Sequence, residues 1–235
     1  MTVKEIMTQL EALGSPQIKK ILLQHGVKEP FFGVKVADLK PIQKKIKKDY
    51  QLAKDLYATG NADAMYLAGL IADDEKMTKK DLQTWVKQAV SGNIFEYTVP
   101  WVTAQGKYGF ELGMEWIDAK EPNIAAAGWA TLGFVVALKP DSELDLKALK
   151  SLLGRVEKHI HTAPNRVRYT MNGFIIALGA YVTPLTADAR ATAKKVGVVE
   201  VDMNGTACKV PDPIESIKKI EDRTGLGKKK KTVKC

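Results

Sequence analysis

The sequence is short of the residues that build metal centres and disulfide frameworks. Its 235 residues include two cysteines, Cys208 and Cys235, and three histidines. His159 and His161 are two residues apart, so they point to different sides of a helix and are poorly placed to share a metal ion. We therefore expect no metal site and no cysteine-rich scaffold, and the scarcity of cysteine favours a reducing compartment.

Several enzyme motifs are absent as well. The chain contains no GxxxxGK(S/T) phosphate loop, no HExxH, no GxSxG and no CxxC pair. These patterns position the phosphate-binding amides, metal ligands and nucleophiles of large enzyme classes. The sequence gives no indication of a small-molecule cofactor, and we expect none.

Long hydrophobic runs are also lacking. No stretch approaches the roughly 18 consecutive apolar residues of a membrane-spanning helix. The first residues, MTVKEIMTQLEALG, alternate polar and apolar side chains and include Glu5 and Glu11, unlike the uninterrupted apolar segment of a signal peptide. We expect a cytoplasmic protein with no membrane partner.

Lysine is plentiful and unevenly distributed. Residues 1–60 carry a net charge of +5, residues 61–163 of −3 and residues 164–235 of +7, within a total of +9. Five of these charges belong to the tail GKKKKTVKC. Basic ends of this kind favour a polyanion such as nucleic acid as a partner, although lysines that only solvate a surface would give the same counts.

Apolar residues follow the period of α-helices over most of the chain. Thr2 and Glu5 form a capping box ahead of one apolar face, and Ser15-Pro16 starts the next helix. A basic helix is expected over 36–48, with Pro41 in or near its first turn. Further helices are expected at about 50–59, 62–72, 79–90, 94–104, 107–118, 122–138, 144–160, 164–182, 184–196 and 212–223.

Only one stretch is strand-like. Residues 197–210 alternate β-branched and polar side chains around Asn204-Gly205, which predicts a short hairpin near 198–210. The chain is otherwise expected to be all-α.

The helices come in pairs that recur roughly every 35–40 residues, which is typical of HEAT- or armadillo-like repeats stacked into a right-handed α-solenoid with a concave face. An irregular helical bundle is the alternative. We expect one repeat domain over residues 1–225, followed by a basic tail over 226–235.

Candidate nucleic-acid contacts are aromatic and basic. Trp101 follows a proline and Trp129 follows a glycine, so each has a neighbour that lets a ligand approach, although core packing explains both equally well. Trp85 and Trp116 are expected in the core. The candidate groove residues are Trp101, Trp129, Tyr97, Phe174, Asn172, Arg166, Arg168, Lys44, Lys48, Lys194 and Lys195.

The order of segments resembles a known family. FFGVKVADLKPIQKKIKKD followed by LAKDLYATGNADAMYLAGLIA is similar to the DNA alkylation repair proteins built from HEAT-like repeats. The resemblance covers about residues 1–225, and the ending VDMNGTACKVPDPIESIKKIEDR with its lysine-rich tail looks like one branch of the family.

The resemblance implies DNA as the partner. Its best-known members are glycosylases that remove positively charged N3- or N7-alkylpurines while they hold the duplex in a concave groove. Their catalysis is attributed to a Trp-x-x-x-Asp segment, an arginine on the following repeat and a second tryptophan. A carboxylate placed near the sugar would stabilise the developing oxocarbenium ion, and aromatic rings would contact the cationic base.

This sequence departs from the glycosylase pattern at each point. Glu96 stands where the tryptophan is expected and Pro100 where the aspartate is expected. The helix over 123–131 contains no arginine, and Phe174 is the only aromatic residue where the second tryptophan should lie. We expect a DNA-binding relative, for damaged or branched DNA, without the usual site. The alternatives are a glycosylase with a rearranged site that uses Glu96, and a protein-interaction scaffold.

Overall fold

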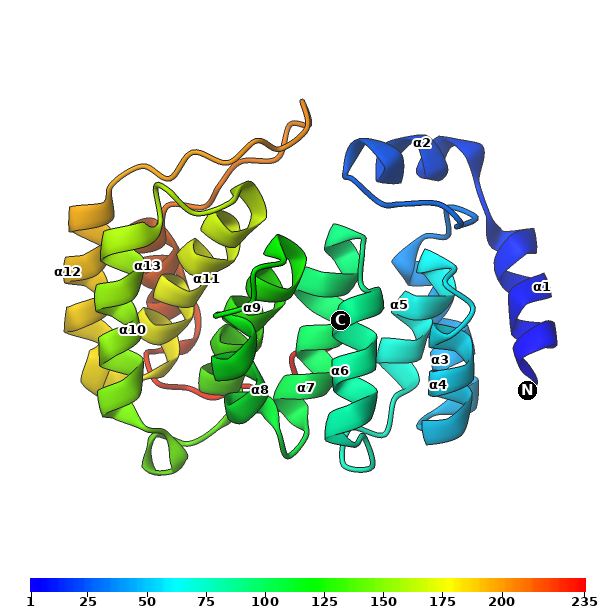
Figure 1. Cartoon of the computed structure of the whole chain (residues 1–235), viewed down its shortest axis with the longest axis horizontal. Coiled ribbons are helices and arrows are strands. Elements are labelled where there is room, and N and C mark those ends of the chain that lie inside the picture. The colour runs from blue at the N-terminus through cyan, green and yellow to red at the C-terminus, as the bar shows by residue number, and fades with distance from the viewer. The chain divides into compact units, whose positions relative to one another are not determined.

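The computed structural model describes residues 1–235, and it contains thirteen α-helices and no β-strand (Figure 1). The helices are α1 Val3–Leu13, α2 Pro16–Gln24, α3 Val36–Ile46, α4 Tyr50–Tyr57, α5 Ala62–Ile71, α6 Lys79–Gln88, α7 Val99–Gln105, α8 Gly109–Trp116, α9 Pro122–Leu138, α10 Leu146–His159, α11 Asn165–Tyr181, α12 Thr186–Val196 and α13 Pro213–Thr224. A π-helix, η1, covers Ile94–Thr98, and two short 3₁₀ turns cover Asp141–Glu143 and Thr183–Leu185.

Helix boundaries follow the sequence prediction closely, with two differences that involve proline. Pro41 lies inside α3 and not in its first turn, so that prediction was wrong. The helix expected over 94–104 is divided into η1 and α7, and the Val99 N–H donates to the Ile94 carbonyl five residues back. Pro100 has no N–H to close a regular turn on residue 96, and its ring would collide with that carbonyl, so the chain widens before it.

The predicted hairpin is a turn without strands. Asn204 and Gly205 both have positive φ, of 55° and 68°, as a two-residue hairpin turn requires. The flanking segments are extended but form no β-ladder with each other. We call residues 197–212 the arm.

The chain divides into two compact units. The first contains residues 1–108, 204–206 and 234–235, and the second contains residues 109–203 and 207–233. The prediction of one domain over 1–225 stays a prediction.

In the first unit, helix α5 is buried along its whole length and packs against α3, α4, η1 and α7. Trp85 is in the core, as predicted, where its ring stacks on Tyr57 with centroids 4.0 Å apart. The Asp63 carboxylate accepts hydrogen bonds from three backbone N–H groups of residues 32–34, at 2.6 to 3.2 Å. This carboxylate fixes the loop that leads into the basic helix α3.

In the second unit, α9 and α11 pack along each other and form its centre, with α8 against α9, and α12 and α13 against α11 (Figure 1). Trp116 is buried, as predicted. Gly128 allows α8 and α9 to come close, because a Cβ at this position would lie 2.5 Å from the backbone nitrogen of Ile117.

No single helix is long and apolar enough to cross a bilayer. Helix α11 reaches the necessary length and apolar composition only together with Thr183–Val196, and the chain bends by 117° between the two.

Candidate nucleic-acid interface

Three aromatic side chains meet in the first unit where α5 lies beside η1 and α7. Trp101 is buried, and the Tyr66 ring lies edge-on to it with centroids 5.4 Å apart. The Tyr97 ring lies 6.0 Å from Trp101 and keeps 38% of its surface exposed. The structure therefore brings Trp101 and Tyr97 together, and Tyr97 is the ring of this cluster that a ligand can reach.

Basic residues stand on the neighbouring helix α3. Lys44 lies in its last turn and Lys48 just beyond it, and both are exposed. The Lys48 ammonium is 3.9 Å from Asp74, whose other contacts include a 3.1 Å hydrogen bond from Gln105 at the end of α7. Asp74 thus connects the basic end of α3 to the helix that carries Trp101.

Glu96, the weak catalytic candidate, lies in η1 and is only 3% exposed. A carboxylate at this depth has no direct path to the sugar of a bound nucleotide. Pro100, at the place of the glycosylase aspartate, is buried in the first turn of α7. In this structure the expected catalytic segment is part of the core of the first unit.

The aromatic candidates of the second unit are buried. Trp129 and Phe174 pack edge-on with ring centroids 5.2 Å apart, and neither is exposed. The Arg155 guanidinium lies 5.7 Å from the Trp129 ring and also forms an ion pair with Asp118. The indole nitrogen of Trp129 is buried without a hydrogen-bond partner. The pair fills the space between α9 and α11.

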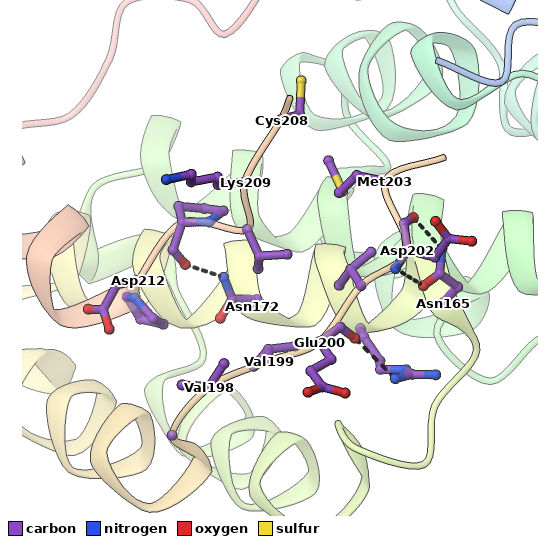
Figure 2. Close-up of a pocket in the computed structure, with 16 residues that line it drawn as sticks. Asn165, Asn172, Val198, Val199, Glu200, Asp202, Met203, Cys208, Lys209 and Asp212 are labelled. Atoms are coloured by element: carbon purple, nitrogen blue, oxygen red, sulfur yellow. Dashed lines mark hydrogen bonds between the residues drawn. The ribbon is translucent and has the colours of Figure 1, made fainter. Parts of the chain in front are cut away.

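Side chains from the start of α11 hold the arm, as Figure 2 shows. Asn165 donates to the Asp202 carbonyl at 2.8 Å and accepts from the Asp202 N–H at 2.7 Å. Arg168 donates to the Glu200 carbonyl at 3.0 Å, and Asn172 donates to the Pro211 carbonyl at 2.8 Å. These bonds replace part of the ladder that a hairpin would have formed.

The space between the two arm segments and α11 is a cavity of about 680 Å³. The side chains that hold the arm line this cavity. Glu200, Asp212 and Lys209 also belong to its lining (Figure 2). Asn172 is 1% exposed, and its side-chain oxygen has no hydrogen-bond partner. The predicted residues Arg168 and Asn172 are therefore brought together here.

The remaining basic candidates of the second unit are dispersed. The Arg166 guanidinium lies 4.4 Å from the Tyr169 ring and contacts the sulfur of Met203 on the arm at 3.4 Å. Lys194 and Lys195 are exposed at the end of α12, and Lys195 pairs with Glu157 of α10 at 3.0 Å.

The lysine-rich tail is the feature that the sequence analysis did not place. In the second unit, the Lys229 ammonium donates to the carbonyls of Val136 and Tyr181, at 2.8 and 2.6 Å, and pairs with Asp141 at 2.8 Å. These carbonyls belong to the last turns of α9 and α11, where the helix dipole is negative. A local pattern could not reveal this, since Tyr181 precedes Lys229 by 48 residues.

In the first unit, the end of the tail is buried. Lys234 is 9% exposed at its side chain and pairs with Asp74 at 2.7 Å. It also donates to the carbonyl of Ala72, the residue that ends α5, at 3.2 Å. Burial lowers the pKa of Lys234, and the charge of Asp74 opposes this effect. Lys234 is therefore an anchor and not a solvated surface charge.

Comparison with known proteins agrees with this architecture. Residues 6–191 match the model of the DNA alkylation repair enzyme family. An uncharacterized protein of Listeria monocytogenes is 31% identical over 229 residues, and one of Listeria innocua is 30% identical over 228 residues. In both cases the match covers 95% of this chain and 99% of the relative.

A solved structure is similar over 100% of both chains, with a TM-score of 0.90 and 36% sequence identity. It represents a new family of proteins related to the HEAT-like repeat DNA glycosylases with affinity for branched DNA structures. The prediction of an all-α fold of HEAT-like repeats is thus confirmed.

Proposed function

The chain belongs to the DNA alkylation repair enzyme family, and from this premise we propose that it binds branched or damaged DNA without catalysing base release. The observation that carries the proposal is the solved relative with affinity for branched DNA, which is 36% identical over the full length of both chains.

The first unit supports a DNA contact on physical grounds. The exposed ring of Tyr97 contacts the buried ring of Trp101, and exposed lysines lie on α3, which packs against α5 of the same cluster. Aromatic faces stack on unpaired bases, and ammonium groups neutralise phosphates. Branch points of DNA expose bases that are less well stacked than those in a continuous duplex, which favours the Tyr97 ring there.

Base release is the less favoured function. The glycosylase segment is replaced by Glu96 and Pro100, and the Glu96 carboxylate is buried. Incubation with alkylated DNA should therefore release no more modified purine than a protein-free control. Release by the wild type that is abolished in Glu96→Gln would overturn this part of the proposal.

Binding is tested by fluorescence anisotropy with a labelled four-way junction and a linear duplex of the same composition. We expect tighter binding to the junction, with affinity for both falling steeply as salt rises. Equal affinity for the two DNAs would remove the preference for branches. No binding to either at about 50 mM salt would refute DNA as the partner and favour the alternative of a protein-interaction scaffold.

A further inference from the structure

The Asn172 side chain, which extends from α11 to the arm, uses only one end of its amide. The nitrogen donates to the Pro211 carbonyl at 2.8 Å. The oxygen is buried and accepts from no donor, and Figure 2 shows it on the side away from Pro211. A buried carbonyl oxygen without a donor is rare in folded proteins, because it loses its hydrogen bonds to water and gains none in return.

Asn165, about two turns earlier on the same helix, provides a direct comparison. It also holds the arm, but both ends of its amide are used. The nitrogen donates to the Asp202 carbonyl at 2.8 Å, and the oxygen accepts from the Asp202 N–H at 2.7 Å. Both asparagines line the same cavity. Attachment of the arm therefore accounts for the nitrogen of Asn172 and leaves its oxygen for another donor.

The rest of the lining indicates what kind of donor fits this cavity. Its volume of about 680 Å³ lies within the range of roughly 300–1,000 Å³ that is typical of small-ligand pockets. Valines, a methionine and two prolines form an apolar wall without an aromatic ring. The charged residues of the lining are Glu200, Asp202, Asp212, Arg168 and Lys209. Because carboxylates outnumber cations, the cavity disfavours a phosphate and favours an apolar ligand that donates a hydrogen bond.

We propose that this cavity, which we call the arm pocket, binds an unpaired nucleobase through its exocyclic amino group, with the Asn172 oxygen as the acceptor. The inference rests on the proposed function, since branch points of DNA supply such bases. The faces of a base match the apolar wall, and the amino group at its edge matches the oxygen. Cytosine has an amino group where uracil has a carbonyl oxygen, and two facing oxygens form no hydrogen bond. The arm pocket therefore distinguishes bases by an edge, whereas Tyr97 of the first unit offers a ring for stacking.

Entry of the base requires the arm to move away from α11, because Asn172 is only 1% exposed. The arm segments form no β-ladder with each other, and α11 holds them by side-chain hydrogen bonds from Asn165, Arg168 and Asn172. A base that donates to the Asn172 oxygen leaves the bond to Pro211 intact, since that bond uses the nitrogen. The base can therefore bind without removing this attachment of the arm.

The test compares two DNA junctions that differ at one unpaired nucleotide at the branch point, which is either 2′-deoxycytidine or 2′-deoxyuridine. Anisotropy titrations with the full chain should show about five- to tenfold tighter binding of the cytosine junction. Asn172→Leu, which keeps a similar volume and removes the acceptor, should bind the two junctions equally. Asn165→Leu is the matched control, because it removes hydrogen bonds to the arm and keeps the acceptor of the arm pocket. It should retain the preference for cytosine even where it binds both junctions more weakly.

A fluorescent base supplies a second readout that does not depend on affinity. 2-Aminopurine carries an exocyclic amino group, and stacking on an aromatic ring quenches its fluorescence. At the unpaired position it should become brighter when the wild type binds, because the lining of the arm pocket contains no aromatic side chain. Quenching would place the base on a ring such as Tyr97 and would overturn the proposal. An equal rise in brightness with Asn172→Leu would also overturn it.

The outcomes separate this proposal from the proposed function. Equal affinity of the wild type for the cytosine and uracil junctions would overturn the arm pocket as a base site and leave junction binding in place. A preference for cytosine that persists in Asn172→Leu would do the same. Absence of binding to both junctions would instead refute the proposed function. Circular dichroism verifies that each variant is folded, and the comparison of the two junctions with the wild type needs no variant.

Discussion

The two units carry similar candidate residues and use them differently. In the first, Trp101 contacts the exposed Tyr97, and helix α5, which packs against their elements, also packs against the basic helix α3. In the second, Trp129 is buried against Phe174, and Arg168 and Asn172 donate hydrogen bonds to backbone carbonyls of the arm. A tryptophan with a small or helix-breaking neighbour therefore does not by itself indicate a binding surface. What separates the two cases is whether a partly exposed ring lies on the buried one.

Replacing Trp129 by alanine should have the largest effect, and the effect should be on stability. Removing this unexposed indole leaves a cavity between α9 and α11, which costs about 3–5 kcal/mol of the free energy of unfolding. Urea denaturation measures the loss. The matched control, Trp129→Phe, removes the unpaired indole N–H and less volume, so it should cost clearly less. A cost below about 1 kcal/mol for the alanine variant would contradict the core role of this residue.

Removing the two exposed lysines at the end of α3 should have the next largest effect. Lys44→Gln with Lys48→Gln should weaken junction binding roughly ten- to thirtyfold near physiological salt, and lower the salt slope by about 2, with little change in stability. Anisotropy titrations at several salt concentrations measure both quantities. Lys87→Gln, which removes an exposed charge from α6 of the same unit, is the control. An equal loss for Lys87→Gln would mean that only net charge matters.

The exposed ring of the first unit should matter for binding alone. Tyr97→Ala should weaken junction binding about tenfold, because one stacked base is worth about 1–3 kcal/mol. Tyr97→Phe keeps the face of the ring and should bind as the wild type does. If both variants bind normally, the contrast between the two units in DNA contact is wrong.

Lowering the pH should produce a smaller effect, a loss of stability that arises from Asp81 in the first unit. Burial raises the pKa of Asp81, but hydrogen bonds from Thr78, Lys54 and Tyr50 outweigh burial and lower the pKa from its ordinary value of 3.8 to about 2. The ionised carboxylate therefore stabilises the fold above pH 3.8, and this contribution is lost as pH falls from 3.8 towards 2.

Because Asp81 is partly solvated, we expect about 1 kcal/mol from it. Asp81→Asn should be less stable than the wild type by this amount at pH 6 and equally stable near pH 2. Urea denaturation at the two pH values measures the difference. A constant gap between the two proteins across this range would show that hydrogen bonding, and not charge, stabilises this corner of α6.

Features with a local cause were predictable from the sequence. The capping box of Thr2 and Glu5 and the helix start at Ser15 are both observed, because the atoms involved lie within three residues of each other. The turn at Asn204-Gly205 is observed for the same reason. Its strands are absent because α11 side chains satisfy part of the backbone that a ladder would have used.

Features whose cause is distant were not predictable. The sequence pattern of the lysine-rich tail is typical of a solvated segment. Lys234 nevertheless donates to a carbonyl that lies 162 residues earlier in the chain. The burial of Trp129 depends on Phe174, which the sequence does not place beside it. Of the candidate site, the sequence predicted Tyr97, Trp101 and the lysines at the end of α3, but it missed Tyr66, which packs against Trp101, and the pairing of Lys234 with Asp74.

The widened turn before Pro100 changes how this segment compares with a regular helix. A π turn holds one residue more than an α turn, so side chains after it are rotated by about 100° relative to those before it. The residue at position 100 therefore matters in two ways: it supplies or lacks a carboxylate, and it sets the direction in which the side chains of α7 point. An aspartate there would introduce a carboxylate, and its N–H would allow a regular turn to close on residue 96, which would turn Trp101 and the rest of α7 to a different direction about the helix axis.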